Sequence, residues 1–285
     1  MFDRISNGFS LAGSTWRVLV RDKHLLFFPL VSGFCFLLVM LSFAVPLATL
    51  VDWNQFQQQL RQNNNRPPVW VYAVSFAFYF CTYFVIIFCN SALISCAMLR
   101  FHGETPRLVD GFAVAFARLP QIFAWALVSA TVGVLLKVLE NAHEKVGEIV
   151  SWLLGSAWSI MTFFVVPVLV VEKTDPMTAV GRSLSLLRKT WGEALVGNMG
   201  LNFILFLLFL PVILIFVAGV MLLAQGMTVP GVAVLVVAGI AFLMHMAVSS
   251  ALHTIFLAAI YLYAAEDRVP AGFDRSVMAG AFTRG

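Results

Sequence analysis

Six long apolar runs, separated by short polar segments, dominate the pattern of this chain. Their ranges are 25–51, 69–99, 120–139, 150–171, 194–224 and 229–263. A transmembrane helix needs about 20 consecutive apolar residues, so each run predicts one span. The last two runs meet at AQGMTVPG, where Gly226, Pro230 and Gly231 predict a short turn. The pattern therefore predicts an all-α, polytopic membrane protein with six transmembrane helices.

Three of the segments between or before these runs have the 3.6-residue period of an amphipathic helix. The clearest has an apolar face made of Met177, Val180, Leu184, Leu187 and Trp191. Its opposite face is polar, with Thr178, Arg182, Ser185 and Lys189. The first twenty residues and residues 107–119 show the same division. Such helices lie along a membrane surface, with the apolar face in the acyl boundary and the basic face towards anionic headgroups.

We expect the basic and aromatic side chains of these helices to contact lipid at the interface. They are Arg4, Trp16, Arg17, Arg21, Arg118, Arg182, Arg188, Lys189 and Trp191. The N-terminal helix places Phe2, Ile5, Phe9, Ala12, Trp16, Leu19 and Val20 on its apolar side. Anionic headgroups are therefore the predicted lipid partners.

The entries to the second and third amphipathic segments match each other. HGETPRLVDG (102–111) and EKTDPMTAVG (172–181) both place a proline five residues before a glycine. Pro106 and Pro176 suit a first helical turn, and Thr105 and Asp175 are suitable N-caps. We therefore predict one membrane domain, 1–265, built from three units that each join an interfacial helix to a transmembrane hairpin. The units are 1–99, 100–171 and 172–265, and residues 266–285 form a short cytoplasmic tail.

Composition supports a lipid environment. The chain is 61% hydrophobic and only 11% charged, whereas soluble domains are about 25% charged. The first apolar run, about 27 residues long, exceeds the hydrophobic region of a signal peptide, so we expect insertion through this first helix. The four cysteines show no CxxC spacing, which argues against a disulfide framework or a zinc site.

The distribution of positive charge predicts the orientation. If the N-terminus is cytoplasmic, 14 of the 18 Lys and Arg residues lie in inside segments. The four outside residues are then Arg61, Arg66, Lys137 and Lys145. Cytoplasmic loops carry the excess of Lys and Arg, so six spans with both termini inside are expected. The polar tract 52–68 is then an outside segment, predicted to be a solvated loop or a frayed helix ending at Pro67 and Pro68.

Polar side chains within the sixth span are the main candidates for a site. His245, Ser249 and His253 recur every fourth residue and therefore form one stripe on a helix. They can make hydrogen bonds between helices, line a transport path, or bind a metal. The helical rise separates the two histidines by about 12 Å, which is too far for one metal ion to use both. No cofactor or metal is expected.

Two further spans carry polar residues that can join this stripe. The second span has Asn90, Ser91 and Ser95, and the fifth has Asn198 and Asn202. Counted from the cytoplasmic borders, Asn90, Asn202 and His253 lie at similar depths of about 12–15 Å, so they can meet in one polar pocket. The small and hydroxyl side chains there are equally suited to close helix packing.

The chain contains no nucleophilic triad, P-loop, Rossmann glycine pattern or metal-ligand cluster. We therefore expect no enzymatic activity and no nucleic-acid partner. Two functions remain. One is a non-catalytic scaffold or accessory subunit that associates with lipid or with a membrane-protein partner. The other is a permease or channel for a small solute or anion, with its path along the polar stripe.

Two stretches also carry a resemblance. GFSLAGSTWRVLVRDKHLLFFPLVSG (8–33), at the N-terminus, resembles an uncharacterised family of bacterial multipass membrane proteins, known only as a domain of unknown function. VEKTDPMTAVGRSLSLLRKTW (171–191) is similar to a repeat in a wider group that includes the membrane domain fused to glycerophosphodiester phosphodiesterases. The resemblance implies a bacterial cytoplasmic (inner) membrane location. It supplies no catalytic residues, and this chain has no phosphodiesterase domain.

Overall fold

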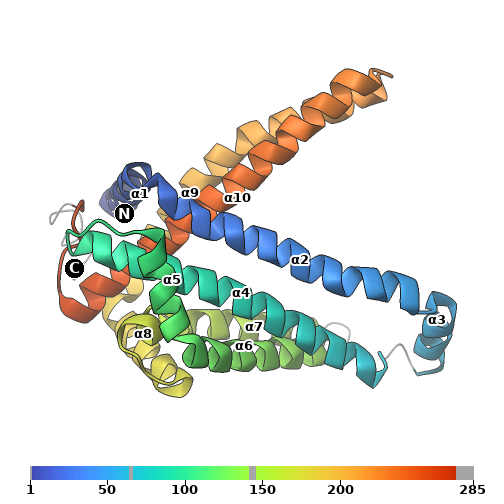
Figure 1. Ribbon diagram of the computed structural model, residues 1–285, viewed down its shortest axis with the longest axis horizontal. Helices are drawn as coiled ribbons and strands as arrows, with labels where there is room; N and C mark the ends of the chain where they lie inside the picture. The colour runs from blue at the N-terminus through green and yellow to red at the C-terminus, as the bar shows by residue number, and fades with distance from the viewer. Residues whose placement is uncertain (1, 64–66, 141–145, 274–285) are drawn as a thin grey trace. The chain divides into compact units, whose positions relative to one another are not determined.

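The computed structural model describes residues 2–63, 67–140 and 146–273, which are helical with short connections and contain no strand (Figure 1). Six helical segments in this part of the chain are long and apolar enough to cross a membrane. They are Lys23–Leu50, Val69–Phe101, Leu119–Glu140, Gly147–Val171, Gly197–Ala224 and Thr228–Glu266. Their ends differ from the predicted runs by no more than three residues. The predicted all-α, six-span fold is confirmed.

The helices follow one another in a simple order. They are α1 (Phe2–Arg21), the short 3-10 helix η1 (Lys23–Leu26), α2 (Phe27–Leu50), α3 (Trp53–Gln62), α4 (Val69–Phe101), α5 (Leu108–Ala117), α6 (Leu119–Glu140), α7 (Val146–Met161), α8 (Val165–Val171), α9 (Pro176–Ala224) and α10 (Thr228–Glu266). They form two compact units. The first contains Met1–Leu30, Cys96–Leu108 and Leu186–Gly285, and the second contains Val31–Ser95 and Val109–Ser185.

The first unit has its core where α1 packs against the C-terminal part of α10. From Ala251 to Leu262, α10 is buried on nearly all sides. Leu11 of α1 and Phe256 of α10 approach Gly197 of α9 so closely that a Cβ there would lie 2.7 Å from the Phe256 ring. Glycine at 197 is what allows α9 to reach this core.

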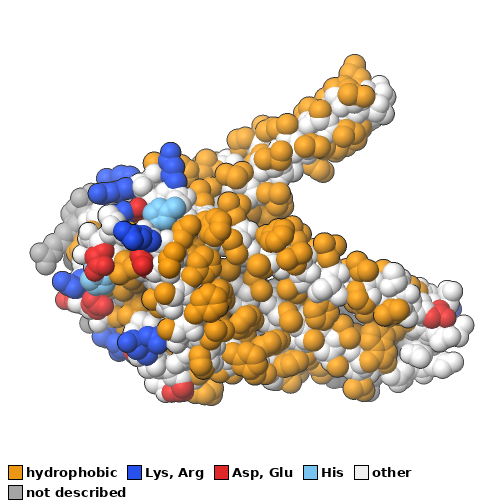
Figure 2. All heavy atoms as spheres, in the orientation of Figure 1, with side chains coloured by type: hydrophobic (Ala, Val, Ile, Leu, Met, Phe, Trp, Pro, Cys, Tyr) orange, Lys and Arg blue, Asp and Glu red, His pale blue; other side chains and the backbone are white. Residues whose placement is uncertain are grey.

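Beyond this core, α9 and α10 form a long antiparallel hairpin (Figure 1). Near its turn the two helices touch at small residues, with Gly219 against Leu235 and Gly231 against Leu223. Gly226 ends α9 with a φ of +80°, a conformation that glycine adopts without strain. Hydrophobic side chains cover the visible face of the hairpin (Figure 2). Exposed apolar side chains over this length are the expected lipid-facing surface of a span.

The second unit contains the α6–α7 hairpin and a row of aromatic side chains on α4. Trp125 of α6 stacks on Trp158 of α7 with ring centroids 5.6 Å apart. Phe80 of α4 meets Phe123 of α6 edge-on at 5.0 Å. These pairs supply packing energy that does not depend on exclusion from water, which is needed where the surrounding solvent is lipid.

The fourth span is not one helix, because α7 ends at Met161 and α8 begins at Val165. Pro167 explains the break: a proline ring clashes with the carbonyl four residues earlier and has no N–H to donate. The buried Phe164 N–H instead donates to the Ser183 hydroxyl of α9 over 2.9 Å. The polar atom freed by the break is therefore satisfied by a neighbouring helix.

The polar tract 52–68 contains a helix with its own cap. The Asp52 side chain accepts hydrogen bonds from the N–H groups of Asn54 and Gln55 at the start of α3. Phe56 contacts both Trp53 and, across the connection, Trp70 of α4. Trp53 and Phe56 lie three residues apart and therefore share one face of α3. This helix is thus capped and amphipathic, and is not a loop.

The predicted interfacial helices bury part of their surface against other helices of the protein. In α1, Ala12 and Leu19 are buried inside the protein, whereas Trp16 is 44% exposed. In the first part of α9, Met177 is 72% exposed, whereas Ser183 is buried. Small and hydroxyl side chains allow close helix packing, so protein covers part of each helix. The orientation of these helices towards lipid stays a prediction.

The third predicted interfacial helix is continuous with the fifth span. Thr190, whose φ of −120° and ψ of 19° are not helical, marks a kink within α9. Its hydroxyl donates to the Leu186 carbonyl over 3.1 Å.

A short helix precedes a hairpin three times along the chain, but no measured similarity relates the three units, so the repeat stays a prediction. The predicted tail falls mostly in residues 274–285, outside the described residues.

Candidate functional site

The candidate site is an open groove of about 370 Å³ on the α9–α10 hairpin of the first unit. Its walls are formed by Phe209, Phe242, His245, Met246, Ser249, Ser250 and His253. All except Phe209 come from α10, within three helical turns. The predicted stripe His245, Ser249 and His253 therefore faces one groove.

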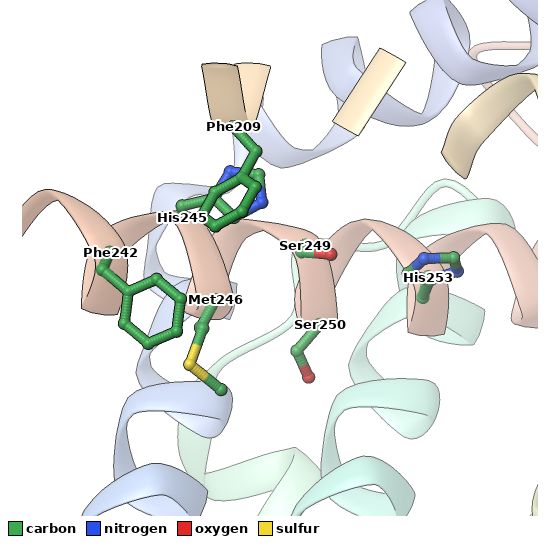
Figure 3. A pocket seen from close by; sticks show the side chains of 7 residues that line it. All are labelled: Phe209, Phe242, His245, Met246, Ser249, Ser250 and His253. Atoms are coloured by element: carbon green, nitrogen blue, oxygen red, sulfur yellow. The ribbon is translucent and has the colours of Figure 1, made fainter. Parts of the chain in front are cut away.

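Figure 3 shows how these side chains follow one another along α10. The Phe209 ring lies against the His245 ring, with centroids 5.0 Å apart and planes inclined by 30°. Phe242 and Met246 lie at one end of the groove, and His253 lies at the other. The groove thus has an apolar end and a polar end.

The polar atoms of the groove have capacity to bind. Within the described part of the chain, the imidazoles of His245 and His253 and the hydroxyls of Ser249 and Ser250 make no hydrogen bond to another residue. Imidazoles and hydroxyls can each donate and accept hydrogen bonds. Together they can hold water, an anion or the polar part of a lipid.

The geometry of the groove supports metal binding less than it supports hydrogen bonding to a ligand. Among the described residues, no group of three or more His, Cys, Asp or Glu side chains gathers in a way that could hold a metal ion. Two histidines separated by two helical turns, about 12 Å, cannot complete one coordination shell. The residues of the groove are better suited to hydrogen bonding.

The other predicted polar residues do not line the groove. On α9, Asn198 is half-buried and Asn202 is exposed. On α4, the Ser91 hydroxyl donates to the Ile87 carbonyl over 2.7 Å, and the Ser95 hydroxyl donates to the Ser91 carbonyl over 2.8 Å. These two serines are satisfied within their own helix. Asn90 belongs to the second unit, so its meeting with Asn202 and His253 stays a prediction.

Several of the predicted lipid-contacting cations have protein partners. Arg182 donates to both carboxylate oxygens of Glu172, at 3.0 and 3.2 Å. The Arg118 guanidinium donates to the Val170 carbonyl at 3.4 Å, in the last turn of α8. Positive charge at a helix C-terminus complements the unpaired carbonyls there. These two arginines therefore bind other residues of the second unit and help to stabilise it.

The remaining predicted lipid contacts are more accessible. Arg17 donates to the Ser14 hydroxyl over 2.9 Å and is otherwise exposed, next to the exposed Trp16. The other exposed cations of this set are Arg21, Arg188 and Lys189. The side chains of Arg4 and Trp191 lie outside the described residues.

Sequence reasoning missed a buried ion pair between Asp22 and Arg100. Both Nε and Nη2 of Arg100 donate to the Asp22 carboxylate, and the two side chains are only 13% and 4% exposed, respectively. Asp22 follows α1, and Arg100 is in the last turn of α4. Asp22 is the acid in the sequence RDK. Because basic residues flank it on both sides, the sequence alone suggested an exposed charge cluster at the membrane interface rather than a buried ion pair.

A second polar contact joins the same end of α4 to the end of α10. His102 Nδ1 lies 2.7 Å from the Met98 carbonyl, and its Nε2 lies 3.7 Å from a Glu266 carboxylate oxygen. The Ala271 N–H donates to the Phe101 carbonyl over 3.3 Å. Residues after α10 therefore fold back onto the end of α4.

Comparison with known protein families shows the family of this chain. Residues 69–272 match a family of unknown function (DUF6159). The chain belongs to this family. The match includes every residue of the groove and the last five spans, but not residues 8–33, which carried the first resemblance. A bacterial origin and the likeness to the phosphodiesterase-linked membrane domain stay predictions. No curated protein and no solved structure matches the chain.

Proposed function

We propose that this member of the family is a non-catalytic integral membrane protein that acts as a lipid-associated scaffold or accessory subunit. The observation that carries this proposal is the groove on the α9–α10 hairpin. Two histidines and two serines line it, within an otherwise apolar span. Polar groups facing acyl chains cost free energy unless they find a partner. A membrane component bound in the groove supplies one.

The chemistry of the groove favours binding over catalysis. Ser249 lies between His245 and His253, but neither imidazole is hydrogen-bonded to its hydroxyl in the described structure. Activating a serine requires a base within hydrogen-bond reach and a third group that orients the base. Among the described residues that line the groove, no carboxylate is present to take that third role.

Extraction of the protein together with its surrounding membrane tests the proposal. Polymer-bounded discs are purified from the source membrane, and native mass spectrometry records the bound lipids and proteins before and after exchange into detergent. We expect retained lipid, a co-purifying membrane protein, or both. A monodisperse protein that keeps no partner, and whose thermal stability is unchanged after complete lipid removal, would contradict the proposal.

A second function is favoured by one observation. The polar groups of His245, Ser249 and His253 continue over two helical turns along a single open groove, which is the arrangement of a solute path. Purified protein in liposomes would then support the flux of small anions or neutral solutes. Replacing both histidines with alanine should abolish that flux, and an unchanged flux would exclude this path.

A further inference from the structure

We infer that the groove binds one anionic phospholipid, with the headgroup phosphate held by Ser249, Ser250 and His253 and an acyl chain lying along Phe209, Phe242 and Met246. This inference rests on the proposed lipid association and specifies the ligand, its orientation in the groove and its depth along the hairpin. Polarity, depth and charge each support it.

The polarity of the groove changes along its length in the same order as that of a phospholipid. Phe242 and Met246 form its apolar end, and the Phe209 and His245 rings lie against each other in the middle. Ser249, Ser250 and His253 provide two hydroxyls and an imidazole at the other end (Figure 3). Hydroxyl and imidazole N–H groups donate to phosphate oxygens, and aromatic and thioether groups pack against hydrocarbon.

The length of the hairpin places the polar end of the groove at the membrane boundary. Ser249 lies about 30 Å along α10 from Thr228, the first residue after the turn, which equals the thickness of the hydrocarbon core. On α9, the exposed Asn202 is also about 30 Å from Ala224, the last residue before the turn. The exposed Asn202 and the serines of the groove thus lie at one depth along the hairpin, near the edge of the hydrocarbon core.

The residues beyond this depth support the same placement. From Ala251 to Leu262 most residues of α10 are buried in protein, and α1 packs against this helix. The span is 39 residues long, far more than a bilayer requires. The extra length is therefore used for packing at the membrane surface, not for crossing the membrane.

Positive charge at this surface favours an anionic lipid over a zwitterionic one. Arg17 and Arg21 are exposed on α1, which packs against α10. Lys23 is exposed on η1, which also contacts α10. Basic side chains near a membrane surface attract anionic headgroups. The same unit thus provides a polar groove at headgroup depth and a basic surface beside its helix.

Titration with defined lipids tests the inference. Delipidated full-length protein in detergent is titrated with phosphatidylglycerol, phosphatidylcholine or inorganic phosphate, and native mass spectrometry measures each bound fraction. We expect phosphatidylglycerol to bind most tightly and inorganic phosphate not to displace it. Full displacement by phosphate would show a free-anion site instead, and equal binding of phosphatidylcholine would overturn the anionic preference.

Variants locate the headgroup. The triple variant Ser249→Ala, Ser250→Ala, His253→Leu should weaken phosphatidylglycerol binding at least about tenfold, the effect of losing one charge-assisted hydrogen bond. Thr228→Val removes a hydroxyl at the opposite end of the same helix and should leave binding unchanged. Wild-type affinity in a triple variant that keeps its normal melting temperature would overturn the inference.

The outcomes separate this inference from the proposed function. If the triple variant misfolds, Ser249→Ala and His253→Gln are measured singly, and each should weaken binding several-fold. A variant that loses phosphatidylglycerol in titrations but keeps a protein partner in polymer-bounded discs supports both statements. Unchanged titrations with a retained partner overturn the groove as a lipid site and leave the accessory role standing.

Discussion

Asp22 and Arg100 form a buried pair that joins the end of α1 to the end of α4. Two guanidinium nitrogens face one carboxylate, an arrangement that combines charge with fixed geometry. Removing the charge of one partner leaves the other buried without compensation. The damage then exceeds whatever the intact pair contributes.

Asp22→Asn should therefore lower the free energy of unfolding by about 3–5 kcal/mol. The matched control is Glu140→Gln, which breaks the exposed pair with Lys137, whose side chains are 48% (Lys137) and 43% (Glu140) exposed. An exposed pair contributes only about 0.2–1 kcal/mol. Thermal unfolding in one detergent compares the two variants, and similar losses in both would contradict the distinction between them.

Asp175 begins α9 and gives a pH-dependent contribution outside the spans. A hydrogen bond from the Thr178 hydroxyl, at 2.6 Å, is the main cause that lowers the pKa of its carboxyl below the ordinary 3.8. The Thr178 N–H and Met177 N–H bonds act in the same direction. Because the folded pKa is depressed, the stabilisation is complete above pH 3.8 and is lost as pH falls through the lower folded value.

Thr178→Val should consequently raise the pKa of Asp175 towards its ordinary value. Carboxyl-carbon NMR of labelled protein in micelles follows the titration directly. An unchanged Asp175 titration in Thr178→Val would show that the hydroxyl bond is not the main cause.

The α9–α10 hairpin depends on close approach near its turn. A Cβ at Gly219 would lie 2.8 Å from the Leu235 side chain and 3.2 Å from the Leu235 backbone nitrogen, so the helices would have to separate. Gly219→Ala should destabilise the protein by about 1–3 kcal/mol, the usual cost of overpacking.

Gly239→Ala is the matched control, because nothing lies within 4 Å of a Cβ at that position in α10. Alanine favours a helix more than glycine does, so this variant should be neutral or slightly stabilising. Melting temperatures in the same detergent distinguish the two. Equal destabilisation would mean that helix packing at Gly219 is looser than the structure shows.

The sequence predicted where the helices lie but not which of their polar side chains pack inside the protein, and particular residues show the physical reasons. Span ends follow from where apolar residues stop, and lipid demands this of any sequence. Pro167 indicates a helix break before α8. The acceptor for the Phe164 N–H, the Ser183 hydroxyl, comes from another helix and could not be identified from the sequence. Ser14 and Thr15 are buried in α1 because their hydroxyls bond to the Ser10 and Leu11 carbonyls. Hydropathy counts both as polar.

The candidate site was predicted in part. Spacing alone placed His245, Ser249 and His253 on one face. Phe209 could not be assigned to that face, because its position opposite His245 depends on the register of the hairpin. That register is set by glycine contacts at the turn, which involve specific shapes and not a periodic pattern.

Orientation across the membrane remains a prediction from the Lys and Arg distribution. With the native cysteines replaced, Gln225→Cys at the hairpin turn should react with an impermeant maleimide in intact cells. Glu104→Cys, in the connection between α4 and α5, should react only after lysis. The two positions serve as controls for each other, and the reverse pattern would invert the predicted topology.

The matched lengths of the two hairpin helices make the groove sensitive to bilayer thickness. Asn202 and Ser249 both lie about 30 Å from the turn, so a membrane of that thickness leaves both at its surface. A thicker bilayer would draw these groups into hydrocarbon, and a thinner one would make the hairpin tilt, each at a fraction of a kcal/mol per Å of mismatch. The hairpin thus favours membranes of one thickness, and those in which it fits best also present phosphate groups at the level of the groove.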